Sequence, residues 1–203
     1  SEDAFKRIEL TYIEKLSRTA EIKGKSALYN DLQIKLLIDT TEAITDYNKA
    51  EPWMKKLLNA YADGINYYLY KNPQVKPALL TKFQPWYQLL WTDGSIGAIS
   101  TAELTMAELK NFYSGDATAA IVVPKDPEYQ TGSNGFAFSP SKTASGNAIL
   151  YINPHVTFYF RPEVQVVSEE GLHAYGAVTW GQFFVYQGFN KYCGWMHTSC
   201  NVD

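Results

Sequence analysis

Apolar residues recur every three to four positions through the first half of the chain, which is the spacing of an amphipathic helix. The pattern predicts helical segments at residues 4–23, 27–47, 52–72, 85–99 and 105–113. Gly24 is typical of a helix end, and Pro52 is typical of a first helical turn. The run Thr105-Met106-Ala107-Glu108 has the form of a capping box, which indicates a short helix.

The spacing changes after residue 132, where apolar and aromatic residues form short runs separated by turn residues. Strands are predicted at Gly135–Ser139, Ala148–Asn153, Val156–Val167, His173–Trp180, Gln182–Gln187 and Gly194–Thr198. Ser145-Gly146-Asn147 predicts a hairpin turn between the first two strands. Residues 114–132 contain two Gly, two Pro and no sustained periodicity, so they are interpreted as an exposed linker. Helices followed by strands indicate an α+β fold.

Composition narrows the class of protein. The chain has 203 residues, of which 46% are hydrophobic, and a net charge of -3, which excludes a disordered chain. Acidic residues outnumber basic ones 21 to 18 without any basic run, which argues against a general nucleic-acid binder. No apolar stretch approaches the roughly 20 residues that span a membrane. The last 71 residues carry only seven of the 39 charges, so both faces of their strands are expected to be covered.

Two cysteines leave their chemistry open. Cys193 and Cys200 would lie about 23 Å apart on one continuous strand, which forbids a disulfide, whereas a turn between them would permit one. A metal site that adds His197 fits no common zinc spacing. Free, partly buried thiols are the default interpretation.

Single residues carry little signal taken one at a time. Ser133 lies in Gly-Ser-Asn-Gly, which in an arbitrary protein is a turn. His155 follows Asn153-Pro154 at an expected bend, where a structural role is the default. The spacing of serines, histidines and acids does not justify a catalytic triad.

Taken in order, several motifs of the second half resemble the penicillin acylase family of N-terminal-nucleophile hydrolases. They are Ser133-Asn134 before a strand, the turn Ser141-Lys142-Thr143-Ala144-Ser145-Gly146, and Asn153-Pro154-His155. The motif has no Asp before Pro154, and in this it resembles acylases of long-chain substrates, such as acyl-homoserine lactone and aculeacin acylases. Gly194-Trp195-Met196-His197-Thr198 resembles the same branch.

The helical half resembles the same family. Its matching segments are Asp3–Lys23, Tyr61-Ala62-Asp63-Gly64-Ile65-Asn66 and Phe83-Gln84-Pro85-Trp86. The resemblance implies an αββα layered sandwich as the fold. It also implies a helical α-subunit segment at residues 1–115, a spacer at 116–132 and β-subunit strands at 133–203, all in one interwoven domain.

The resemblance implies a self-activating amide hydrolase with Ser133 as its nucleophile. The precursor would cut its Gly132–Ser133 bond, so that Ser133 becomes an N-terminal residue with a free α-amine. That amine serves as the base while the hydroxyl attacks an amide carbonyl and forms an acyl-enzyme. An α-amine has a pKa of about 8, which suits this role near neutral pH.

Further roles follow from the same resemblance. His155 is expected to support and orient the nucleophile, and the backbone N–H of Ser199 is expected to donate to the oxyanion. Asp203 and Glu108 are candidate ligands of a structural calcium ion, with solvated surface acids as the alternative. Ile96, Ile99 and Glu103 are candidate residues of the acyl pocket. No cofactor is required by this chemistry.

The resemblance also implies partners and a location. We expect a small-molecule amide substrate, such as an N-acyl homoserine lactone, a β-lactam or a lipopeptide, and the remaining segments of an α/β heterodimer. A periplasmic or extracytoplasmic bacterial location is expected, and the chain is interpreted as a fragment or an unprocessed precursor piece.

The alternative hypothesis is a non-catalytic aromatic-rich binding module or a degenerate acylase relative. It rests on aromatic residues that would face solvent, namely Phe158, Tyr159, Phe160, Phe183, Phe184 and Tyr186.

Overall fold

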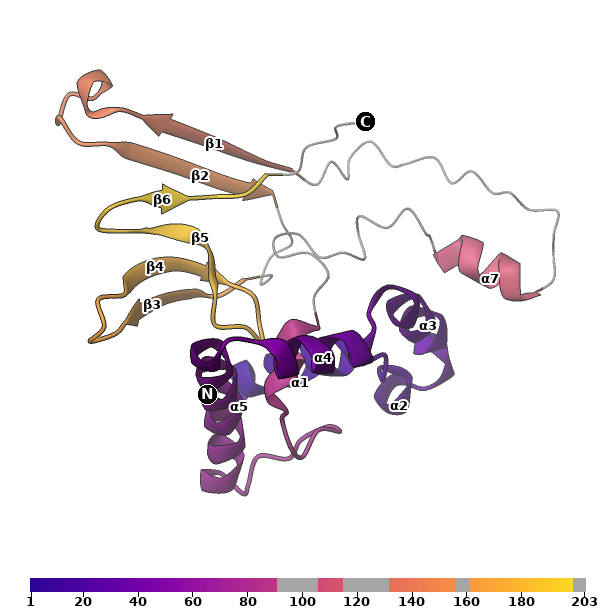
Figure 1. Cartoon of the computed structure of the whole chain (residues 1–203). Helices are drawn as coiled ribbons and strands as arrows, with labels where there is room; N and C mark the ends of the chain where they lie inside the picture. Colours follow the sequence, from indigo (N-terminus) through magenta and orange to yellow (C-terminus); the bar gives the residue numbers. More distant parts are fainter. Residues whose placement is uncertain (91–105, 115–131, 156–160, 199–203) are drawn as a thin grey trace. The chain divides into compact units, whose positions relative to one another are not determined.

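The helices come first along the chain and the strands follow (Figure 1). The structure is a computed structural model and describes residues 1–90, 106–114, 132–155 and 161–198. The chain divides into two compact units, Ser1–Val122 and Val123–Asp203. The described strands are antiparallel and form two sheets, so the predicted α+β class is confirmed.

The first unit is built from helices of very different length. Its described helices are α1 (Glu2–Lys15), α2 (Ala20–Lys23), η1 (Lys25–Ala27), α3 (Leu28–Leu37), α4 (Thr40–Lys49), α5 (Pro52–Lys71), η2 (Pro85–Leu89) and α7 (Met106–Ser114). The helix predicted at 52–72 is confirmed as α5, with Pro52 in its first turn. The short helix predicted at 105–113 is confirmed as α7. The segment predicted at 85–99 is described only to residue 90, where it is the short 3-10 helix η2.

The single helix predicted at residues 4–23 is wrong, because the chain breaks after α1. Ser17 adopts a left-handed backbone with φ of 57°. The N–H groups of Ser17 and Arg18 then bond back to the carbonyls of Glu14 and Ile13, at 2.8 and 2.9 Å. This is the Schellman pattern of a helix end, which usually has glycine at the left-handed position. Gly24 ends only the second, four-residue helix.

The single helix predicted at residues 27–47 is also wrong, because it is two helices. Ile38 is extended (φ -119°, ψ 115°), which interrupts the helical hydrogen bonds. Asp39 then caps α4, since its side chain accepts a hydrogen bond from the N–H of Thr41 at 2.7 Å. An aspartate at this position satisfies a donor that the first turn of a helix leaves without a partner.

The apolar faces predicted for residues 27–47 and 52–72 are only partly buried. The apolar side chains of these faces that lie exposed are Leu28, Leu36, Ile44, Trp53 and Leu57. The buried core is formed by Tyr12, Ile34, Leu58, Phe83 and Leu90, all at most 2% exposed. The rings of Tyr12 and Phe83 lie 5.9 Å apart, which joins α1 to the segment before η2.

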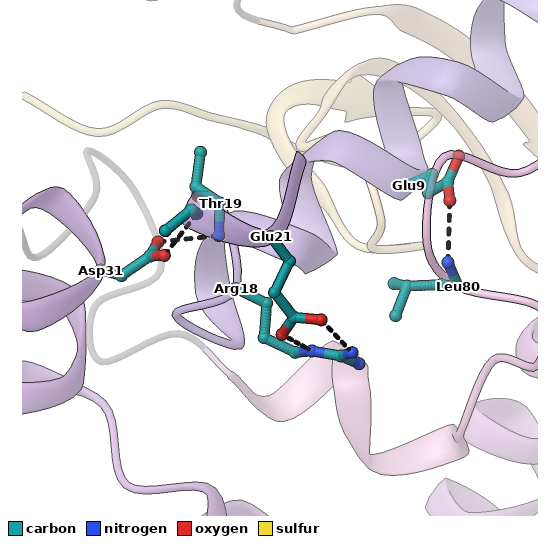
Figure 2. A network of polar contacts seen from close by, with 7 residues as sticks. Glu9, Arg18, Thr19, Glu21, Asp31 and Leu80 are labelled. Carbon is teal, nitrogen blue, oxygen red and sulfur yellow. Dashed lines mark hydrogen bonds and ion pairs between the residues drawn. The ribbon is translucent and has the colours of Figure 1, made fainter. Parts of the chain in front are cut away.

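One buried carboxylate organises the irregular segment between α5 and η2. Glu9 on α1 is 1% exposed. Its Oε1 accepts a hydrogen bond from the N–H of Leu79 at 2.8 Å. The same oxygen accepts from the N–H of Leu80 at 2.9 Å (Figure 2). Its Oε2 accepts from the N–H of Ala78 at 3.0 Å. Three backbone donors that have no helix or sheet partner are thereby satisfied by one side chain.

A second carboxylate acts in the same way at the start of α2. The two side-chain oxygens of Asp31 accept from the N–H groups of Thr19 and Ala20, at 2.8 and 2.6 Å (Figure 2). Asp31 lies on α3, so α3 supplies the N-terminal cap that α2 lacks in its own sequence. Arg18 and Glu21 pair beside this contact, at 2.6 and 2.7 Å.

Asn66 on α5 joins this helix to the segment just before η2. The Asn66 amide donates to the carbonyl oxygen of Phe83 at 3.0 Å and accepts from its N–H at 2.8 Å. Both polar backbone groups of Phe83 are thereby bonded to one side chain of α5. The contact holds the Phe83 ring in the core.

The second unit consists of two antiparallel sheets. Strands β1 (Gly132–Phe138) and β2 (Ile149–His155) form a hairpin, with η3 (Pro140–Lys142) in its connection. The other sheet has the order β3 (Glu163–Val167), β4 (His173–Val178), β5 (Val185–Asn190) and β6 (Gly194–Trp195). The predicted hairpin turn is confirmed, and Gly146 adopts the positive φ of 70° that its turn requires.

Several strand boundaries differ from the prediction. β1 begins at Gly132, three residues before the predicted start, because its backbone pairs along the whole of β2. For the same reason His155 ends a strand and does not lie at a bend. β5 begins at Val185 because a turn at Gly181 (φ 89°), closed by a bond from the N–H of Gln182 to the carbonyl of Thr179, precedes it. β6 is only two residues long.

Replacing Glu9 with Ala is expected to destabilise the first unit by about 3–5 kcal/mol, because it leaves three backbone donors without an acceptor. Glu9→Gln keeps one oxygen and is expected to cost about 1–3 kcal/mol. The free energy of unfolding from urea titration measures both. Glu14→Ala, at an exposed position of the same helix, is the matched control. An equal effect of the Glu9 and Glu14 substitutions would contradict this role.

Alkaline pH is expected to destabilise the first unit through its buried phenols. Burial raises the pKa of Tyr61 to about 12 and that of Tyr12 well above its ordinary value of 10. Between about pH 10 and 12 the unfolded chain therefore loses these protons while the folded chain keeps them, so the free energy of unfolding falls as the pH rises. Each phenol contributes a slope of up to about 1.4 kcal/mol per pH unit.

Urea unfolding at several pH values in this range measures the slope. Tyr61→Phe is expected to make it shallower, while Tyr70→Phe, at an exposed position of the same helix, is expected to leave it unchanged. Parallel slopes for the wild type and Tyr61→Phe would count against the assignment.

Candidate functional site

The register of the β1–β2 hairpin places the candidate residues at one end of it. Ser133 pairs with Pro154, and Gly132 pairs with His155. Residues paired across an antiparallel sheet share a face, and successive residues alternate between faces. Asn134, Asn153 and His155 therefore share one face, and the side chain of Ser133 belongs to the other.

The chain after β6 lies against the face of Ser133. The Thr198 hydroxyl donates to the carbonyl oxygen of Ser133 at 2.7 Å, across 65 positions of sequence. A Cβ added to Gly135 would overlap the sulfur of Met196, so the Met196 side chain packs directly against the backbone of Gly135. The side-chain amide of Gln187 donates to the carbonyl of His197 at 3.1 Å, which ties the segment to β5. The segment after β6 is thus hydrogen-bonded both to Ser133 on β1 and to Gln187 on β5.

Three polar side chains meet on the other face. The Nε2 atom of His155 lies 3.4 Å from the Nδ2 atom of Asn134 and 3.3 Å from the Nδ2 atom of Asn153. The two asparagines are direct partners across the hairpin. The side chains that contact Ser133 and His155 here are neutral amides and a hydroxyl, which are suited to orient groups by hydrogen bonding.

The structure brings together three of the predicted site residues, Gly132, Ser133 and His155, and a neighbour of a fourth. Ser133 and His155 lie at the same end of the hairpin. Thr198, the residue before Ser199, bonds to Ser133. Ser199 itself, Ile96, Ile99, Glu103 and Asp203 lie outside the described residues. Glu108 is exposed on α7.

No cluster of three or more His, Cys, Asp or Glu side chains that could hold a metal ion occurs among the described residues. Because Asp203 is not among them, the calcium site stays a prediction. Cys193 is an exposed free thiol, and Cys200 lies outside the described ranges. The location and the heterodimer also stay predictions. Within the described part of the chain, no helix combines the length and apolarity needed to cross a membrane.

Sequence reasoning assigned no role to Asn134, Asn153 or Thr198, although each lies inside a motif it used. Their contacts with His155 and Ser133 depend on strand register and on the path of the chain after β6, which motif spacing does not reveal. The signal available was the repeated proximity of polar residues to Ser133 and His155 in the sequence.

The alternative hypothesis expects exposed aromatic side chains, but those of its residues that the structure describes are half-buried. Phe183, Phe184 and Tyr186 are half-buried, and the rings of Phe183 and Phe184 lie 4.3 Å apart. Phe158, Tyr159 and Phe160 lie outside the described residues. The exposed aromatic residues of the hairpin are instead Phe136, Phe138 and Tyr151, which contact one another on the face that also carries His155.

Comparison with known families identifies the class of protein. The model of the penicillin amidase family matches residues 1–203. The chain therefore belongs to the penicillin amidase family. This is a hydrolase family of N-terminal nucleophile enzymes, so membership supports an amidohydrolase or acylase function in general.

Thr198→Val is expected to destabilise the second unit by about 1 kcal/mol, because valine keeps the shape of threonine but cannot donate to Ser133. Thr198→Ser keeps the hydroxyl and is the matched control. Urea unfolding of both variants measures the difference. If the Ser and Val variants were equally destabilised, the hydroxyl contact would have no energetic role.

Proposed function

We propose that the protein is an amide-hydrolysing acylase whose nucleophile is Ser133, freed by self-cleavage of the Gly132–Ser133 bond. The observation that carries the proposal is the anchoring of this bond. Gly132 pairs with His155, and the carbonyl of Ser133 accepts from Thr198. These contacts on both sides of the Gly132–Ser133 bond support the proposal, and the motif resemblance assigns the nucleophile to Ser133.

The self-cleavage consists of an acyl transfer from nitrogen to oxygen, followed by hydrolysis of the ester. The Ser133 oxygen attacks the carbonyl carbon of Gly132, the C–N bond breaks, and the nitrogen takes the proton of the hydroxyl. Water then hydrolyses the resulting ester. Gly132 ends as a carboxylate, and Ser133 gains the free α-amine that it lacks in the continuous chain.

Turnover of a substrate amide uses the same atoms. The Ser133 oxygen attacks the amide carbonyl while the α-amine takes its proton, and the protonated leaving amine departs. Water hydrolyses the acyl-enzyme. The backbone N–H of Ser199 is proposed as an oxyanion donor, supported by the contact of the preceding residue, Thr198, with Ser133.

For the substrate we propose an amide with a long acyl chain, such as an N-acyl homoserine lactone or a lipopeptide, with β-lactams as the other class. The proposal rests on the likeness of Asn153-Pro154-His155 to the corresponding branch. Ile96, Ile99 and Glu103 are proposed to line the acyl pocket. We also propose that the active form is an α/β heterodimer, because the cleavage divides the chain at Ser133.

The test is the intact mass of the protein and of its Ser133→Ala variant. We expect the wild type to separate into two chains at Gly132–Ser133, and Ser133→Ala to remain one chain and lose acylase activity by several orders of magnitude. Ser145→Ala, in the turn of the same hairpin, is the control and should be cut normally. An uncut wild type, or a cut Ser133→Ala, would overturn the proposal.

The alternative is a non-catalytic binding module. The exposed cluster of Phe136, Phe138 and Tyr151 favours it, because solvent-facing aromatic side chains are common at binding surfaces. An uncut wild type with unchanged behaviour on Ser133→Ala is the outcome this alternative expects.

A further inference from the structure

Two side-chain amides converge on the same ring nitrogen at the end of the hairpin. The Nδ2 atoms of Asn134 and Asn153 lie 3.4 and 3.3 Å from Nε2 of His155. Asn134 reaches it diagonally from β1, and Asn153 reaches it from two residues earlier on β2. Because these three residues are on one face, the arrangement follows directly from the hairpin register.

The chemistry of the three groups indicates which ring nitrogen carries the imidazole proton. An amide nitrogen only donates hydrogen bonds, so the nitrogen that faces it must accept. Nε2 can accept only when it carries no proton, and the neutral ring then carries its proton on Nδ1. A proton on Nε2 would face the hydrogens of both amides.

We propose that Asn134 and Asn153 are positioning residues that hold His155 in the Nδ1–H tautomer, so that His155 acts as a hydrogen-bond donor and not as a base. The lone pair on Nε2 is shared by two donors and is not available for a proton from Ser133. Nδ1–H is the group of the ring that remains to donate to the reacting groups.

This inference rests on the proposed function and sharpens it, because it leaves the α-amine of Ser133 as the base. It also gives His155 a role, hydrogen-bond donation, that does not require a basic ring nitrogen. A comparable contact occurs elsewhere in the unit, where the Gln165 amide nitrogen lies 2.8 Å from Nε2 of His173. His173 is thus an internal reference for the same tautomer, away from Ser133.

The tautomer is measurable in the wild-type protein. Histidine-selective ¹⁵N labelling with long-range ¹H–¹⁵N correlation spectra distinguishes a ring nitrogen that carries a proton from one that does not. His155→Gln assigns the signals. We expect Nδ1 of His155 to carry the proton at neutral pH, in cut and uncut protein alike. A protonated Nε2 in the wild type overturns the proposal and needs no variant.

Reversing the polarity of the amides tests their role. Asn134→Asp and Asn153→Asp keep the shape of the side chain but offer only acceptors, so we expect Nε2 of His155 to gain a proton in each variant. Asn147→Asp, in the turn of the same hairpin, is the control and should leave the spectrum unchanged. If both Asp variants fold and keep Nδ1–H, the amides do not position the ring and the proposal fails.

Kinetics separates positioning from simple packing. Loss of side chains that orient a metal-bound histidine typically costs about 10- to 100-fold, and we expect a fall in kcat of similar size for Asn153→Asp with KM little changed. A purely structural role would lower the amount of folded protein without altering kcat per folded molecule, and that result would contradict the proposal.

The two proposals fail separately. An uncut wild type with Nδ1–H on His155 removes the acylase function and leaves the hydrogen-bond assignment without a reaction to serve. A cut, active enzyme with a protonated Nε2 keeps the function and overturns the positioning role of the asparagines.

Discussion

The register of the β1–β2 hairpin is the constraint on which the candidate site depends. Pairing Gly132 with His155 places a histidine across from the proposed cleavage bond. It also places both asparagines on the histidine's face. A slip of one residue would put Asn134 on the face opposite His155 and Asn153 and would move Gly132 away from His155. The register is supported by two contacts of β1 with the segment after β6. Met196 packs against Gly135, and the Thr198 hydroxyl donates to the carbonyl of Ser133.

The helical unit depends on a different device, in which polar side chains satisfy backbone groups far away in sequence. Glu9 reaches the segment at residues 78–80, Asp31 caps α2, and Asn66 binds Phe83 on both of its backbone groups. Irregular segments have no ladder or helix to satisfy their N–H groups, so buried ones require such partners. Two of these three side chains are charged acids that are almost fully buried, and they compensate the loss of water by hydrogen bonds.

How much of this was predictable depends on whether the signal is local. The helix α5 follows from its periodicity, from Pro52 at its start and from Asn72-Pro73 at its end. The break at Asp39 also had a local signal, since Asp39 and Glu42 have the spacing of a capping pair. The break at Ser17 had none, because serine rarely takes a left-handed backbone and only the packing around α1 compensates its cost.

The candidate site likewise has some features with a local sequence signal and others without one. The motifs around Ser133 and His155 were enough to identify the family, and they made these two residues candidates whose roles stay predictions. The start of β1 at Gly132 was missed because Gly-Ser-Asn-Gly has the composition of a turn, and long-range pairing with β2 overrides that preference. The contacts of Thr198 and the asparagines required the register itself, which no local pattern contains.

The register also indicates what self-cleavage would change besides creating an amine. In the continuous strand, alternation sends the Ser133 side chain to the face opposite His155. Ser133 cannot reverse this direction without breaking the pairing of its neighbours Gly132 and Asn134. Cleavage of the Gly132–Ser133 bond would make Ser133 a terminal residue with a backbone bond on one side only. Its side chain and its amine could then rotate while Thr198 still holds its carbonyl. On this argument the cut releases the nucleophile from strand geometry and supplies its base in one step.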